Sequence, residues 1–154
     1  MDKTMTLLKN LHIAYKNLAL YEQALTHPSY NGDVNTKHQD YEKLEFMGDA
    51  VLGYVTADLV YKNRPEMSEG NLTKLRSVLV STKPLAEYAR KINLHEYIRI
   101  GHSITLNQVK ESDKILENVL EALIGATYLD AGLKVAHQMV EYDVVNKIKE
   151  SLTK

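Results

Sequence analysis

The spacing of apolar residues is helical along most of the chain and is clearest between residues 40 and 62. With about 100° of rotation per residue, one side of this segment carries a stripe of core residues: Leu44, Met47, Val51, Val55 and Leu59. Weaker stripes of the same period cover residues 3–11, 19–25, 68–80, 84–92, 113–130 and the stretch from 134 to the C-terminus. The pattern predicts a protein built from helices.

Proline and glycine mark the ends of these helices. Pro28 ends the second helix, because proline restricts the conformation of the residue before it. Pro65 follows the long helix, and Pro84 suits the first turn of a later one. Gly132 closes the helix before the last, where glycine is the preferred residue.

The segments between the helices show little regular pattern. Residues 31–38 are polar and rich in turn formers, and residues 101–112 form the longest weakly patterned stretch. Only residues 97–100 alternate as a strand would, so the predicted fold class is all-α. The chain length fits one domain over residues 1–154, without repeats or linkers.

Three acids lie opposite the core stripe of the long helix. Glu42, Glu45 and Asp49 fall within roughly a 60° sector, so like charges stack on neighbouring turns and something positive should offset them. Phe46, the only phenylalanine, projects near the edge of this acidic sector. An apolar ring there indicates a second surface, for which a partner protomer is one candidate.

A second acidic segment belongs to a helix that ought to be buried. Between residues 113 and 130 apolar residues point almost all the way round, which is typical of a central helix. Glu121 is then hard to expose, so it must be protonated, paired with a base or bound to a cation. It shares a face with Asn118 and Gly125, and this mostly small face allows another helix to cross closely.

If the long helix crosses there, its acids meet those of the central helix. Glu45 and Asp49 would then face Asn118 and Glu121 around one point. Such an oxygen-only site suits Mg²⁺ or Mn²⁺ better than zinc. A di-iron centre would call for Glu-x-x-His pairs, and neither helix contains histidine. The remaining alternative for the acids of the long helix is a solvated face.

Composition restricts the function classes further. The chain has no cysteine, which excludes disulfides, thiolate metal sites and cysteine nucleophiles. Its net charge of −1 shows no basic footprint, so any nucleic-acid binding must use local features. No apolar run is long enough to cross a bilayer, and the first residues lack the layout of a secretion signal, so we expect a cytoplasmic protein.

His27 and Ser29 flank a proline at a helix end, where capping or packing is expected rather than nucleophilic catalysis.

Four segments, in this order, resemble the motifs of the ribonuclease III family. They are Ala24–Tyr30, Glu42–Leu52, Glu69–Arg76 and Ile115–Asp130, and the match spans about residues 17–133. The resemblance implies a helical endonuclease domain that cleaves double-stranded RNA during RNA processing, with one cut per protomer of a homodimer. It also implies products with 5′-phosphate and 3′-hydroxyl ends and short 3′ overhangs.

The resemblance also implies site residues. The family's four metal-binding side chains correspond to Glu45, Asp49, Asn118 and Glu121. Mg²⁺ is the implied cofactor, with Mn²⁺ as a possible substitute. Two further acids of the family's catalytic valley correspond to Glu42 and Glu69, and an aromatic that plugs a socket on the partner corresponds to Phe46. Candidate RNA contacts are the cationic side chains of Lys74, Arg76 and Lys83, because lysine and arginine are usually exposed to solvent and bind phosphate groups.

The chain departs from the family pattern at one ligand. Asn118 stands where the family usually has aspartate, and a neutral amide oxygen should bind the metal more weakly. A natural active variant and an aspartate replaced to trap an inactive form both fit this observation. Bacterial members usually continue into a double-stranded-RNA-binding domain, whereas this sequence ends at Lys154. A truncated chain and one that binds RNA through the nuclease domain alone both fit.

Three functions therefore compete. The first is a Mg²⁺-dependent endonuclease for double-stranded RNA. The second is a catalytically weakened or inactive module that binds RNA or scaffolds a complex, suggested by Asn118 and the missing RNA-binding domain. The third is a helical interaction protein with solvated acids, which the ordered match of four segments disfavours.

Overall fold

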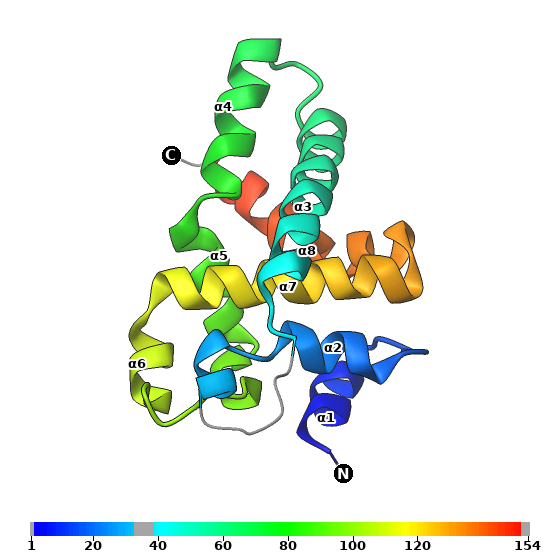
Figure 1. Ribbon diagram of the computed structural model, residues 1–154. Coiled ribbons are helices and arrows are strands. Elements are labelled where there is room, and N and C mark those ends of the chain that lie inside the picture. The colour runs from blue at the N-terminus through cyan, green and yellow to red at the C-terminus, as the bar shows by residue number, and fades with distance from the viewer. Residues whose placement is uncertain (1, 33–38, 152–154) are drawn as a thin grey trace.

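The computed structural model describes residues 2–32 and 39–151, and the regular elements in these ranges are helices (Figure 1). In chain order they are α1 (Lys3–Asn10), α2 (Leu18–Ala24), η1 (Pro28–Gly32), α3 (Glu42–Asn63), α4 (Glu69–Leu79), α5 (Thr82–Lys91), η2 (Leu94–Tyr97), α6 (Leu106–Glu111), α7 (Asp113–Ala131) and α8 (Leu133–Ser151). The short alternating stretch at residues 97–100 takes part only in an isolated bridge between Thr26 and Arg99. The prediction of an all-α fold is confirmed.

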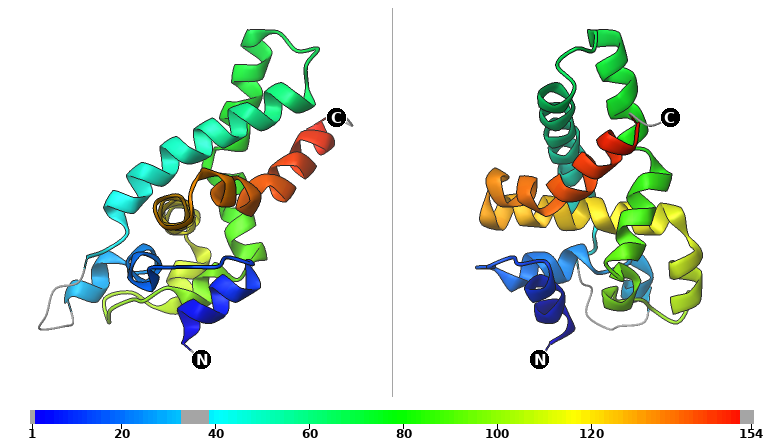
Figure 2. Two further views of the ribbon diagram at one scale, coloured as in Figure 1. Left: turned by 90° about the vertical axis from the view of Figure 1, so that its right-hand side faces the viewer. Right: turned by 180° about the vertical axis from the view of Figure 1, so that it is seen from behind.

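Helix α7 lies across the middle of the molecule and is the centre of its core. It packs against α2, α3, α5, α6 and α8, and both views of Figure 2 show other helices on several sides of it. Every residue from Val119 to Thr127 is buried. The helix is enclosed because its apolar side chains point in all directions, as the sequence predicts.

Helix α3 crosses α7 at very close range, and this is the most extensive helix contact in the structure (Figure 1). Two glycines permit the approach. A Cβ atom on Gly48 of α3 would stand 1.6 Å from the carbonyl oxygen of Glu121, and one on Gly125 of α7 would stand 2.3 Å from that of Leu44. Neither position can hold a larger residue without moving the backbone of the other helix.

Hydroxyl side chains set the starts of several helices. Ser68 accepts a hydrogen bond from the backbone N–H of Asn71 at the start of α4, and Ser112 accepts one from Ile115 at the start of α7. Thr105 and Gln108 form a reciprocal capping box that begins α6. This short helix lies within residues 101–112, the weakly patterned stretch for which the sequence predicts no helix.

Asp130, at the end of α7, fastens the N-terminal part of the chain to the core. Its carboxylate accepts hydrogen bonds from the backbone N–H groups of Lys16 and Asn17 and from the hydroxyl of the buried Tyr21. Burial and this carboxylate raise the pKa of Tyr21, so its hydroxyl stays protonated and donates.

None of the helices in the described ranges combines the length and the apolar character needed to cross a bilayer.

Candidate active site

The crossing of α3 and α7 brings the predicted polar residues together. In the amide orientation that satisfies both of its polar atoms, Asn118 donates from its nitrogen to Oε1 of Glu45, at 3.0 Å, and to the backbone oxygen of Lys114, at 3.3 Å. Beside this pair, the carboxyl of Glu121 is hydrogen-bonded to Asp49. The four residues therefore form two contacts between the helices, Asn118 with Glu45 and Glu121 with Asp49.

Glu121 is buried, with 5% of its surface exposed, and is held in an unusual protonation state. Its pKa is raised from 4.5 to about 8, first by burial and then by the hydrogen bond and negative charge of Asp49. The charges of Glu117 and Glu45 add to the effect. Near neutral pH the carboxyl therefore holds a proton, which it donates to Asp49.

Glu45 lies at the partly exposed side of the same cluster. Burial raises its pKa, and the nearby carboxylates of Glu117, Glu42 and Asp49 act in the same direction. The ammonium group of Lys114 opposes them. The site thus carries an excess of negative charge that one lysine only partly balances, which favours binding of a cation.

Glu117 is a member of the cluster that the sequence analysis missed. It is buried on α7, and its Oε1 accepts a hydrogen bond from Nζ of Lys114 at 3.2 Å. A signal was available, because Glu117 precedes Glu121 by one helical turn and therefore shares its face. From the sequence, only Asn118 and Gly125 are assigned to the face of Glu121.

The donor atoms fit a hard divalent cation. Carboxylate and amide oxygens are the ligands that Mg²⁺ and Mn²⁺ prefer, and burial together with nearby negative charge already destabilises the charged forms of Glu45 and Glu121. In the described residues, however, no three histidine, aspartate or glutamate side chains are already arranged to hold a metal ion. They are joined in pairs instead, Asn118 to Glu45 and Glu121 to Asp49, so these hydrogen bonds must open when a cation binds.

The two further acids of the predicted site occupy different places. Glu42 is exposed in the first turn of α3 and lies close enough to raise the pKa of Glu45. Glu69 is the exposed first residue of α4, which begins beyond the far end of α3 in Figure 1. Because Gly48 at the crossing lies 15 residues, or about 23 Å of helix, before the end of α3 at Asn63, one chain does not bring Glu69 to the crossing.

Phe46 projects outward, as its position on the helix predicts. Its side chain is 78% exposed, close to the 50% exposed Leu129 at the end of α7. Between them is a mainly apolar hollow that is also lined by Gln23, Gln39, Glu42, Lys43, Leu44 and Met47. The candidate RNA contacts Lys74, Arg76 and Lys83 are all exposed, on α4 and in the first turn of α5.

His27 and Ser29 serve the local fold. The backbone N–H of Ser29 donates to Nδ1 of His27, at 3.0 Å, and the Ser29 hydroxyl lies 2.8 Å from the same nitrogen. The hydroxyl oxygen in turn accepts a hydrogen bond from the backbone N–H of Gly101. These contacts tie the loop after α2 to the segment before α6, as expected for a capping role.

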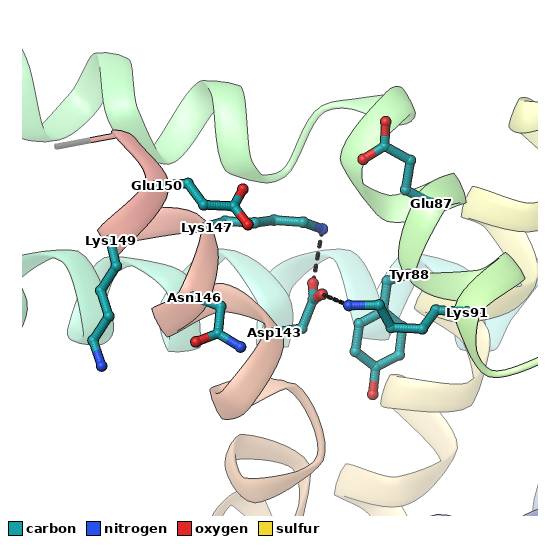
Figure 3. Close-up of a pocket in the computed structure, with 8 residues that line it drawn as sticks. All are labelled: Glu87, Tyr88, Lys91, Asp143, Asn146, Lys147, Lys149 and Glu150. Atoms are coloured by element: carbon teal, nitrogen blue, oxygen red, sulfur yellow. Dashed lines mark hydrogen bonds and ion pairs between the residues drawn. The ribbon is translucent and has the colours of Figure 1, made fainter. Parts of the chain in front are cut away.

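A polar cavity lies between α5 and α8 (Figure 3). Its most buried charge is Asp143, whose Oδ2 pairs with Lys147 at 2.7 Å and whose Oδ1 lies 3.8 Å from Lys91. Lys147 also donates to the backbone oxygen of Pro84. Because a lysine lies near each oxygen of Asp143, this cluster stabilises the packing of α8 against α5. It is separate from the acids at the α3–α7 crossing.

Comparison with known proteins places this arrangement in a family. A model of ribonuclease-III-like proteins matches residues 17–148. Ribonuclease 3 of Borreliella afzelii is 41% identical over 133 residues, which make up 86% of this chain and 54% of that protein. The chain thus spans about half the length of this relative.

Solved structures agree with the sequence comparison. The crystal structure of the nuclease domain of ribonuclease III from Campylobacter jejuni has a TM-score of 0.81 at 34% identity, covering 93% of this chain and 94% of that one. A second structure of that domain, described for flexibility in a region involved in dimer formation, has a TM-score of 0.80 at 35% identity. It covers 92% of this chain and 94% of that one.

Proposed function

Because the chain belongs to the ribonuclease III family, we propose that it hydrolyses phosphodiester bonds of double-stranded RNA with a divalent cation bound between α3 and α7. The observation that carries the proposal is the meeting of Glu45, Asp49, Asn118 and Glu121 at the helix crossing. Mg²⁺ is the proposed cofactor and Mn²⁺ a substitute. Products are 5′-phosphate and 3′-hydroxyl ends with short 3′ overhangs.

The cation supplies two things that phosphodiester hydrolysis needs near neutral pH, an activated water and stabilisation of the leaving oxygen. The protein residues hold it and adjust the charge around it. Glu45, Asp49 and Glu121 supply carboxylates, and Asn118 supplies a neutral amide oxygen after its amide has turned away from Glu45. Glu121 must lose its proton in the process, because a ligand carboxylate is deprotonated.

In this proposal Glu42 and Glu69 do not bind the cation directly. Glu42 adds negative charge one turn before Glu45 on α3. Glu69, at the start of α4, belongs to the wider RNA-binding valley. Lys74 and Arg76 follow it on the same helix and are proposed to contact phosphates, so RNA binding should weaken strongly with salt.

We also propose that the chain works as a homodimer. The nuclease domain of Campylobacter jejuni ribonuclease III has a region involved in dimer formation. In this chain an exposed phenylalanine lies beside an apolar hollow, and a two-fold axis would place Phe46 of each protomer in the hollow of its partner. Such an isologous contact would remove both apolar surfaces from water.

The second candidate is a weakened or inactive module that binds RNA without cutting it. It is favoured by one observation, the neutral Asn118 among the ligands. The experiment that separates the two is incubation of the chain with a long RNA duplex in Mg²⁺ or EDTA. Cleavage that requires the metal and is lost in Glu121→Gln supports the nuclease.

Glu111→Gln is the matched control for this assay. Glu111 is exposed at the end of α6, so its replacement removes the same charge without touching the cluster. It should cleave as the unmodified chain does. Duplex binding without cleavage in Mg²⁺ would support the inactive module. The absence of both binding and cleavage would contradict both functions.

A further inference from the structure

Glu117 faces the candidate site from α7, next to the residue that departs from the family pattern. Rotation of 100° per residue places Glu121 between Glu117 and Asn118 around the helix. The three side chains thus leave α7 within a sector of roughly 100°. Glu117 is also close enough to Glu45 on α3 to interact with it electrostatically.

The Glu117 carboxylate is buried but only half satisfied. The residue is 8% exposed, and Oε1 accepts the hydrogen bond from Lys114. Oε2 is buried and has no hydrogen-bond partner in the described part of the chain. A buried carboxylate oxygen left without a partner is costly, so a purely structural glutamate would be expected to have both oxygens paired.

Asp143 shows what a structural buried acid looks like in this protein. It is buried to a similar degree, with 9% of its surface exposed. A lysine ammonium lies near each of its oxygens, Lys147 at 2.7 Å and Lys91 at 3.8 Å (Figure 3). Glu117 has one lysine on one oxygen, and its other oxygen is buried without a hydrogen-bond partner in the described part of the chain.

We propose that Glu117 supplies the negative charge that Asn118 lacks at the divalent-cation site. The inference rests on the proposed function, because it concerns the same metal. In this arrangement the carboxylate that position 118 lacks is provided by the preceding residue on α7. Glu117 is then the fourth anionic side chain, beside Glu45, Asp49 and Glu121.

Lys114 is the counter-ion of Glu117 before the metal binds. Its side chain is 68% exposed, so the ammonium can move into solvent without a large desolvation change. It also lies near enough to Glu45 and Glu121 to interact with both charges. Lys114 therefore competes with a divalent cation for the same carboxylates.

The test is the dissociation constant for Mn²⁺, measured by isothermal titration calorimetry on the full chain without RNA. Glu117→Gln keeps the side-chain volume and should weaken Mn²⁺ binding about tenfold. The Glu111→Gln control should bind as the unmodified chain does. The double variant Glu117→Gln/Asn118→Asp moves the charge to the neighbouring residue and should restore the affinity to within about threefold.

The outcomes separate this inference from the proposed function. If the unmodified chain binds Mn²⁺ and Glu117→Gln binds it equally well, the inference is wrong and the proposed function stands. Absence of Mn²⁺ binding by the unmodified chain would overturn both. If Glu117→Gln does not unfold cooperatively on heating, the variant is not properly folded and the test uses Lys114→Met instead. It removes the competing cation and should tighten Mn²⁺ binding about threefold, and unchanged or weaker binding would overturn the inference.

Discussion

Gly48 of α3 and Gly125 of α7 lie against each other at the helix crossing. A Cβ atom on Gly48 would come within 3.0 Å of the backbone nitrogen of Gly125, in addition to its clash with the carbonyl of Glu121. Because Glu45 and Asp49 flank Gly48 on α3, the distance between the two backbones also sets how the acids meet. The crossing and the candidate site are one structural feature.

Replacement of Gly48 by alanine should therefore be strongly destabilising. The clash is with backbone rather than with a flexible side chain, so we expect a loss of about 3 kcal/mol or more and a Tm lower by about 10 °C. Gly53→Ala is the control on the same helix, because its Cβ would meet nothing within 4 Å. It should leave the protein unchanged or stabilise it by about 0.5–1 kcal/mol. Equal effects of the two changes in thermal unfolding would contradict the close crossing.

Asn118→Asp should raise cleavage at limiting Mg²⁺ by about tenfold, which corresponds to about 1.4 kcal/mol. The change adds a charged ligand and places a third carboxylate beside Glu45 and Glu121. For the same reason the metal-free variant should be less stable, since the hydrogen bond from the amide to Glu45 becomes a repulsion. Activity across a Mg²⁺ titration checks the first effect, and the Tm in EDTA checks the second. Equal or lower activity throughout the titration would count against the ligand role of position 118.

The stability of the metal-free protein should fall as pH rises from 5.5 to 8. The pKa of Glu121 in the folded protein is about 8, above its ordinary value of 4.5. Between these values the folded chain holds a proton that the unfolded chain has lost, so stability decreases with pH, by on the order of 1 kcal/mol per pH unit. Urea unfolding in EDTA at several pH values measures this slope. Glu121→Gln should flatten it, and an unchanged slope in that variant would show that Glu121 is not the group responsible.

Phe46→Ala should shift the proposed dimer toward monomer. The side chain is 78% exposed in one chain, and its loss would remove the largest apolar group at the edge of the hollow beside Leu129. Tyr142→Ala on α8 is the matched control, because Tyr142 is 79% exposed and does not line that hollow. Sedimentation velocity at micromolar concentration distinguishes the variants. A monomeric unmodified chain, or the same dimer in Phe46→Ala, would exclude the role given to Phe46.

The main helix pair could be predicted from the sequence because its signals are strong and local. The apolar residues around α7 require a central position, and the small face that includes Gly125 requires a close neighbour. The burial of Glu121 follows directly from this periodicity. The predicted helices at 40–62 and 113–130 accordingly match α3 and α7 to within two residues at each end.

The features that sequence reasoning missed depend on single contacts. Helix α6 has six residues and only Val109 buried, so it shows no apolar stripe, although its capping box was visible as Thr105 and Gln108. Glu117 received no role from the sequence, because a helical pattern does not show that one of its carboxylate oxygens is buried without a partner. The position of Glu69 depends on where α4 begins relative to the far end of α3, which is a property of the tertiary fold.

The central claim is that a divalent cation binds where α3 crosses α7. The most direct measurement is the anomalous difference density of Mn²⁺ in crystals of the chain soaked with MnCl₂, collected above and below the manganese absorption edge. The account predicts a peak bounded by Glu45, Asp49 and Glu121, with the Asn118 amide turned so that its oxygen faces the ion. A peak elsewhere, or none at the crossing in crystals that diffract well after soaking, would contradict it.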